Sequence, residues 1–130
     1  MGMPDIISDL FSTLQNAEMV GKRECIIKPF SKLAENILKV LQREGYIGEF
    51  EYIDDGRGGK FRVQLLGRIT RSKSIRPRFP VKVNEIVEWA EKCLPAKDVG
   101  IVIISTSKGV MTHKECLKKH VGGVLIGYVY

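Results

Sequence analysis

The stretch from residue 101 to residue 123 limits the possible folds more than any other part of the chain. It opens with the apolar run IVII and passes directly into the hydroxyl-rich segment STSKG. A short apolar run rich in β-branched residues is typical of a buried strand, and polar residues with a glycine are typical of a tight loop. We therefore expect a buried strand that delivers short polar side chains to the surface.

A helix is predicted directly after this loop. Thr112 is followed three positions later by Glu115, the pattern of a capping box, in which each side chain satisfies a backbone N–H group of the first turn. The helix should begin at His113 and stop at Gly122 and Gly123, because glycine is common just beyond the last turn. The sequence VLIGYVY that follows predicts a strand. The expected unit is strand, loop, helix, strand.

The side chains of the loop suit a nucleic-acid ligand. Ser105, Thr106 and Ser107 offer hydroxyls, Lys108 offers an ammonium group, and the backbone around Gly109 offers N–H groups near a helix N-terminus. Such groups bind phosphate and sugar oxygens. Short hydroxyls also fit the wide, shallow minor groove of folded RNA, where they meet 2′-OH groups. The alternative is that the segment forms an ordinary surface turn.

Positive charge is concentrated in the second half of the chain. Residues 1–66 contain nine Lys and Arg against ten Asp and Glu, whereas residues 67–130 contain twelve against five. The net charges of the two halves are thus −1 and +7, which add to the total of +6. Within the second half, one stripe has six basic residues and no acidic one: Arg68, Arg71, Lys73, Arg76, Arg78 and Lys82. This stripe predicts a surface for a polyanion, with a merely solvated face as the alternative.

Composition narrows the class of protein. A chain of 130 residues, 44% of them hydrophobic, is long enough for one compact domain or two small packed ones. No apolar run approaches the length that spans a membrane, and no signal sequence is evident, so we expect a soluble, unsecreted protein with no membrane partner. Its three cysteines form no CxxC pair, which favours a reducing compartment over a disulfide framework.

The first half reads as α-β-α-β-β, two helices on a three-stranded sheet. Pro4 and Asp5 offer a helix start, ECIIK reads as a short strand, and Ser31 can cap a second helix that ends at Gly45. Two alternating segments around the turn DDGRGG then predict a hairpin, with Phe50 and Tyr52 on the face of the sheet that also carries Phe61, Val63 and Leu65.

The second half begins at a junction in the basic stripe. We expect one more helix there, capped by Asn84, with Ile86, Val87, Ala90 and Leu94 on its apolar face. The expected fold class is α+β: an N-terminal α-β-α-β-β two-layer unit, residues 1–67, packed against a small, mostly antiparallel β C-terminal unit with short helices, residues 68–130. The C-terminal unit should be the one that binds RNA.

Catalysis and metal binding have little support in the sequence. His113, Cys116 and His120 could share one helix face as zinc ligands, but a structural zinc site takes four ligands and the chain has no other histidine. A half-buried Cys116 flanked by surface histidines is the simpler interpretation. There is no GxSxG, phosphate-loop or HExxH motif. We therefore expect no catalytic residues, no metal, no cofactor, no small-molecule substrate and no enzyme activity.

Several motifs together resemble one known family. They are PDIISDL, KPFSKLAENILKVLQREGYI, RPRF, STSKGVMTH with the GG that follows, and the aromatic C-terminus. In this order and over essentially the whole chain, they resemble the small-subunit ribosomal protein eight family, with the segment from Phe79 to Pro95 closer to archaeal and eukaryotic members. His113 stands where bacterial members often have an acidic residue.

The resemblance implies a non-enzymatic structural protein of the small ribosomal subunit, located on cytoplasmic ribosomes. Its expected partners are the central domain of small-subunit rRNA, which it would bind early in assembly, and neighbouring small-subunit ribosomal proteins. In such a complex the hydroxyl loop would enter the minor groove, and the cations would neutralise phosphates. The expected RNA-binding residues are Ser31, Lys32, Arg76, Arg78, Ser105, Thr106, Ser107, Lys108, Gly109, Val110, Met111, Thr112, Gly122 and Gly123.

A winged-helix DNA-binding module is the rival hypothesis. A capped helix followed by a hairpin imitates a recognition helix and its wing. Against this hypothesis, only one helix is expected before the capped one, and the basic charge lies outside the proposed wing.

Overall fold

A computed structural model describes residues 6–130 and contains, in those residues, four helices and eight strands. The strands form antiparallel sheets, so the predicted α+β class is confirmed. The chain divides into two compact units, the first ending at Thr70 and the second running from Arg71 to Tyr130. The helix start expected at Pro4 and Asp5 lies outside the described residues.

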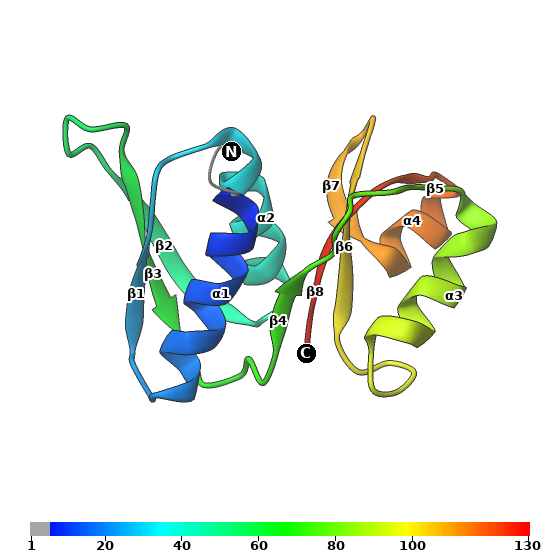
Figure 1. The fold of residues 1–130 in the computed structure, drawn as a ribbon, viewed down its shortest axis with the longest axis horizontal. Coiled ribbons are helices and arrows are strands. Elements are labelled where there is room, and N and C mark those ends of the chain that lie inside the picture. The colour runs from blue at the N-terminus through cyan, green and yellow to red at the C-terminus, as the bar shows by residue number, and fades with distance from the viewer. Residues whose placement is uncertain (1–5) are drawn as a thin grey trace. The chain divides into compact units, whose positions relative to one another are not determined.

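The first unit follows the expected order α-β-α-β-β. Its elements are α1 (Ile6–Met19), β1 (Glu24–Ile27), α2 (Lys32–Arg43), β2 (Ile47–Ile53) and β3 (Lys60–Leu65). The strands form an antiparallel sheet in the order β1-β3-β2, and both helices cover the same face of it (Figure 1).

Periodicity explains this unit. On β3, Phe61, Val63 and Leu65 are buried and alternate with exposed residues, as expected for a sheet with one covered face. The helix α1 buries one stripe, which consists of Ile7, Leu10, Phe11, Leu14 and Ala17. Ser31 caps α2, since its Oγ accepts a hydrogen bond from the backbone N–H of Ala34 at 3.0 Å.

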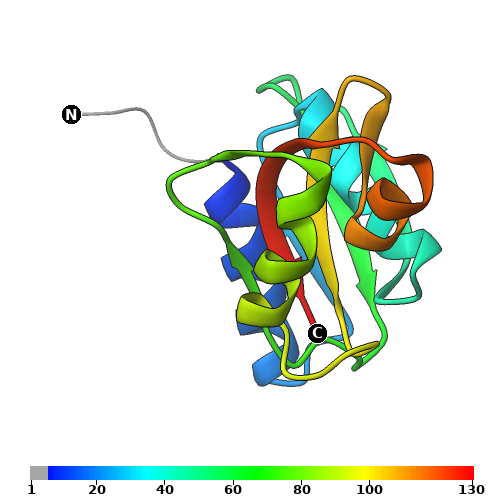
Figure 2. The ribbon, with the colours of Figure 1, turned by 90° about the vertical axis from the view of Figure 1, so that its right-hand side faces the viewer.

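The second unit is built around its last strand. Its elements are β4 (Ser72–Ser74), β5 (Pro80–Val81), α3 (Val83–Cys93), β6 (Ile101–Thr106), β7 (Gly109–Thr112), α4 (His113–Lys119) and β8 (Gly123–Val129). The sheet has the order β4-β8-β6-β7, and β5 also pairs with β8. The strand β8 therefore pairs with three other strands, and the helices α3 and α4 lie over one face of the sheet (Figure 2).

The hydroxyl segment differs from the loop that the sequence suggested. The strand β6 continues through Thr106, the turn is Ser107 and Lys108, and β7 pairs back onto β6 with Thr106 opposite Gly109. The expected order strand, loop, helix is therefore wrong, because a second strand stands between the hydroxyls and the helix. The helix does begin at His113, with the predicted capping box, but it ends at Lys119, where His120 takes a left-handed conformation (φ 59°) before the two glycines.

The helix α3 also departs from expectation. Its N-cap is Lys82 rather than Asn84, and the Glu85 carboxylate accepts a hydrogen bond from the Lys82 backbone N–H at 2.8 Å. Val87, expected on the buried face, is 49% exposed, whereas Ile86 is 1% exposed. The helix is therefore rotated so that Ile86 faces the core and Val87 faces outward.

Candidate nucleic-acid interface

The second sheet has a row of residues on the face opposite its helices. Four residues pair side by side across the strands: Pro80 with Val124, Val124 with Ser105, and Ser105 with Val110. The residues next to them along the strands belong to the core under α3 and α4, namely Val81, Leu125, Ile104 and Met111. Because successive strand residues point to opposite faces, the row Pro80, Val124, Ser105 and Val110 faces away from that core. We call this row the open row.

The hairpin that ends β6 is fixed by one hydroxyl. The Oγ1 of Thr106 donates to the carbonyl of Gly109 at 2.8 Å and accepts from the backbone N–H of Lys108 at 3.0 Å. In the part of the chain that the structure describes, the hydroxyls of Ser105 and Ser107 have no partner. The three hydroxyls, grouped together from sequence, therefore have two different roles: Thr106 shapes the turn, and the two serines remain available for a ligand.

The glycines near this hairpin are needed for two different reasons. Gly109 has φ 115°, a conformation that side chains disfavour, and a Cβ there would meet nothing within 4 Å. At Gly123 a Cβ would collide with the Ser105 carbonyl and lie 2.9 Å from Ile104 Cγ2. At Gly122 it would collide with the Val81 carbonyl. The GG pair thus permits close packing of the protein's own strands, in addition to its expected place among the RNA-binding residues.

Two residues expected at the interface lie in the interior. Met111, one of the expected RNA-binding residues, is 3% exposed and belongs to the core of the second unit, so its side chain has almost no surface to offer a ligand. Thr112 is 2% exposed, and its hydroxyl accepts from the N–H of Glu115 at 3.2 Å. Val110, which is half-buried and on the open row, keeps an accessible side chain.

The basic residues Arg76 and Arg78 lie on the segment between β4 and β5. This segment is held at both ends, because the Ile75 N–H donates to the Ile126 carbonyl and the Leu125 N–H donates to the Phe79 carbonyl, each at 3.0 Å. Both arginines are exposed. The segment that carries the two arginines therefore lies along β8. On its other side, β8 pairs with β6 and places Val124 opposite Ser105.

Ser31 and Lys32 belong to the first unit. The Ser31 hydroxyl is used by the cap of α2, and Lys32, with its side chain 75% exposed, pairs with Glu35 at 3.1 Å. An exposed pair of this kind contributes little to stability, so the ammonium group can exchange its partner at small cost.

Sequence reasoning missed Val124 and Phe79, which are both 36% exposed. Val124 lies on the open row, and Phe79 follows Arg78 with its ring 5.3 Å from that of Trp89. Val124 stands in the apolar run VLIG at the start of β8, and the face of the sheet on which it lies is set by the pairing with β6.

The chemistry of the buried cysteine and histidine is that of a core. Burial raises the pKa of the Cys116 thiol to about 11, which is the reverse of what a nucleophile or metal ligand requires. His113 is buried, contrary to the surface position we expected, and its Nδ1 accepts from the Val102 N–H at 3.1 Å. Burial lowers the pKa of His113.

Comparison with known proteins gives consistent matches over the whole length. The family model described as "Ribosomal protein S8" matches residues 5–130. Proteins named "Small ribosomal subunit protein uS8" from Pyrobaculum islandicum and Caldivirga maquilingensis are each 55% identical over 130 residues, covering 100% of this chain and of the relative. Among residues 6–130, none of the helices has the length and apolar character needed to cross a membrane.

Proposed function

Because this chain belongs to the ribosomal protein S8 family, we propose that it binds the central domain of small-subunit rRNA directly and supports assembly of the subunit. The family is one of structural, non-enzymatic proteins of the small ribosomal subunit, and the ribosome of the cytoplasm is accordingly the place of action. Its partners are rRNA and neighbouring ribosomal proteins.

The geometry of the β6–β7 hairpin is the observation that carries this proposal. Thr106 holds the turn by two hydrogen bonds, and beside it Ser105 and Ser107 present hydroxyls without partners in the described residues. A rigid tip with small donors and acceptors suits an RNA minor groove, because 2′-OH groups and base edges there both donate and accept. Lys108, exposed at the same turn, adds a charge for phosphate.

The open row extends this surface. Val124 and Val110 flank Ser105 and offer apolar contact to a ribose or an unstacked base. Arg76 and Arg78 approach the same end of β8 and would neutralise phosphates at the edge of the contact. We propose that Gly109, Gly122 and Gly123 act through the backbone, and that Met111 and Thr112 act only by supporting the hairpin from inside.

Lys32 is proposed as a second contact, on the first unit. It lies in the first turn of α2, where a cation is unfavourable to the helix dipole by about 0.3–1 kcal/mol. An RNA phosphate would compensate for this cost. Ser31 contributes by holding the helix start rather than by its hydroxyl, which is already engaged.

The winged-helix alternative has no support from a specific observation. Its recognition helix would be α2 and its wing β2 with β3, yet in residues 6–31 only α1 precedes α2. The excess positive charge lies in residues 67–130, outside that wing.

Salt-dependent filter binding tests the proposal. The chain with Arg76→Ala and Arg78→Ala should bind central-domain rRNA more weakly, and its plot of log affinity against log salt should be shallower by roughly 0.7–0.9 for each phosphate that is no longer neutralised. Lys22→Ala with Lys39→Ala removes two exposed charges from the first unit and should leave the slope nearly unchanged. Equal affinity of the parent chain for duplex DNA and for this RNA in the same salt would refute the proposal.

A further inference from the structure

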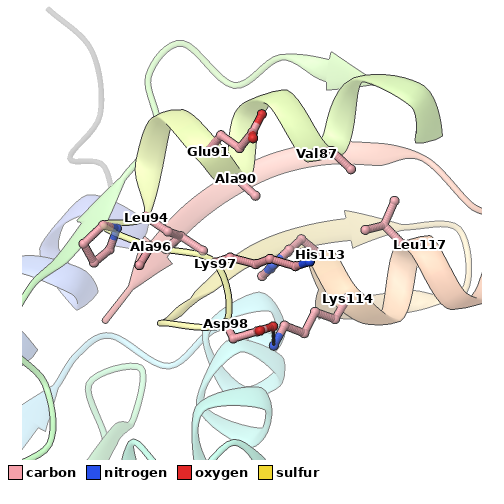
Figure 3. Close-up of a pocket in the computed structure, with 11 residues that line it drawn as sticks. Val87, Ala90, Glu91, Leu94, Ala96, Lys97, Asp98, His113, Lys114 and Leu117 are labelled. Atoms are coloured by element: carbon pink, nitrogen blue, oxygen red, sulfur yellow. Dashed lines mark hydrogen bonds and ion pairs between the residues drawn. The ribbon is translucent and has the colours of Figure 1, made fainter.

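A groove lies between α3 and α4, on the side of the second unit that carries its helices (Figure 3). It has a volume of about 780 Å³ and is lined on the α3 side by Val87, Ala90 and Leu94, and on the α4 side by His113 and Leu117. We call it the α3–α4 groove. Figure 3 shows Val87 and Leu117 directed into the space between the two helices. Its apolar lining includes Val87, which is 49% exposed.

The α3–α4 groove has the dimensions of a binding site for a helix. Its wall on α3 repeats at positions 87, 90, 91 and 94, which is one face of a helix over two turns, about 10 Å at 1.5 Å per residue. Helix-in-groove recognition uses apolar anchors at similar spacing on the partner. A wall of this length accommodates two such anchors, one near Val87 and one near Leu94.

His113, which lines the groove, carries one hydrogen-bond donor for a ligand. The Nδ1 of His113 accepts from the Val102 N–H, so the neutral ring carries its proton on Nε2. No buried side-chain nitrogen or oxygen lacks a partner in the described residues, and no other bond of His113 exists there, so Nε2 is not completely buried although the residue is only 7% exposed. Burial also lowers the pKa of His113, which favours the neutral ring. A carbonyl or carboxylate oxygen of a ligand can accept from this N–H.

The two sides of the groove carry side chains of opposite charge. Among the residues that line the groove, Glu91 is exposed on α3, while Lys97 lies on the connection between α3 and β6 and Lys114 lies on α4. Asp98 pairs with Lys114 at 3.2 Å, but Lys97 and Glu91 have no partner in residues 6–130. A protein helix can present charges of both signs to Glu91 and Lys97, whereas an RNA strand carries only negative charge, so the charges favour a protein. They also fix its orientation, with basic residues toward α3 and acidic ones toward Lys97.

We propose that the α3–α4 groove binds an amphipathic helix of a neighbouring protein of the small ribosomal subunit. The inference rests on the proposed function, because the partner is sought within the subunit. The helix presents two apolar side chains to the groove, an oxygen acceptor to His113, and charges complementary to Glu91 and Lys97. The protein contact and the RNA contact thus lie on opposite faces of one sheet, the first over its helices and the second along the open row.

Site-specific photo-crosslinking tests this proposal in the full chain. A benzoylphenylalanine replaces Val87, or as control Val20, which is 70% exposed on the first unit, and the chain is assembled with small-subunit rRNA and proteins. The expected product at position 87 is a single crosslinked peptide of another ribosomal protein, from a helix with an apolar face and a basic edge. A crosslink to rRNA, a crosslink to a second copy of this chain, or no crosslink above the Val20 control would overturn the proposal.

Charge variants in the crosslinking chain test the orientation. Glu91→Lys should lower the crosslink yield about tenfold, because a basic edge would meet a like charge, whereas Glu24→Lys, an exposed residue of β1, should leave it within about twofold. Equal losses would contradict the assigned orientation.

Central-domain RNA binding of Val87→Ser separates this proposal from the proposed function. The Val87→Ser variant should bind the RNA with the affinity of the parent chain but should no longer bind the helix of the partner protein. If the parent chain fails to bind the RNA but still gives the peptide crosslink, the proposed function is wrong, and the proposed binding of a partner helix in the groove is still supported. If the parent chain binds the RNA but position 87 gives no crosslinked peptide, the proposed binding of a partner helix is wrong, and the proposed function is still supported.

Discussion

Two neighbouring residues of the β6–β7 hairpin should respond in opposite ways to removal of a hydroxyl. Ser107→Ala should weaken rRNA binding and leave stability unchanged, while Thr106→Val should lower stability first. The distinction follows from the structure, because the Thr106 hydroxyl makes two internal hydrogen bonds, of 2.8 and 3.0 Å, and the Ser107 hydroxyl makes none within residues 6–130.

The magnitudes follow from the hydrogen bonds that each substitution removes. Each internal bond contributes about 0.5–1.5 kcal/mol net, so Thr106→Val should cost about 1–3 kcal/mol, with the lower half expected at this half-buried site. A decrease of about 1 kcal/mol lowers Tm by roughly 4–8 °C in a domain of this size class. Ser107→Ala should change stability by less than about 0.5 kcal/mol. In the complex it leaves an RNA group unpaired, at about 1–3 kcal/mol, or roughly 5- to 150-fold in affinity.

Thermal denaturation and filter binding to central-domain RNA at one fixed salt concentration measure the two effects. Ser72 is unsuitable as a control because it is buried, at 3% exposure, so exposed Ser12 on α1 serves instead. Ser12→Ala should bind like the parent chain. If Ser107→Ala also binds like the parent, the hairpin is only a turn, and the interface must be sought along Arg76 and Arg78.

Three further outcomes are expected. Gly123→Ala should destabilise the protein by about 1–3 kcal/mol, seen as a lower midpoint in urea, since its Cβ would meet the backbone of Ser105, whereas Gly21→Ala has free space for its Cβ and suffers only from its positive φ. Burial lowers the pKa of His113 below its ordinary value of 6.5, so the unfolded chain binds more protons than the folded one. The free energy of unfolding of the parent chain should therefore exceed that of His113→Asn by its full amount above about pH 6.5, and the difference should decline as pH falls through the lowered pKa. A constant difference from about pH 8 to about pH 5 would contradict this. A fragment from Gly67 to Tyr130 that circular dichroism shows to be folded should retain most of the rRNA affinity, and stronger binding by residues 1–66 would reverse the assignment of the interface.

The helices and strands that could be predicted are those whose sequence pattern lies within the element itself. Both helices of the first unit and the β2–β3 hairpin follow from apolar periodicity, and the start of α4 follows from its capping box. The short strands β4, β5 and β7 could not be predicted in this way. They have two to four residues each, and β4 and β5 exist because β8 pairs with them from about fifty residues away in the sequence.

The candidate site was predictable in outline but not in its division of roles. Composition and spacing identified the segment from Ser105 to Gly109, yet only the register of β6 with β7 shows that Met111 points inward and Val110 outward. A one-residue change of register exchanges the two faces of a strand. Phe79 and Val124 were missed for the same reason, since no local pattern states which strand lies beside them.

The position of β8 also affects how the protein forms during synthesis. The strands β4, β5 and β6 all pair with β8, which is the last of these strands to be translated. The first unit can close its sheet once residue 65 has left the ribosomal tunnel, because in the described part of the chain β1, β2 and β3 pair only among themselves. The second unit must keep the apolar side chains of β6 uncovered until residues 123–129 emerge. A nascent chain stalled before residue 123 should therefore present one folded unit and one region that chaperones recognise.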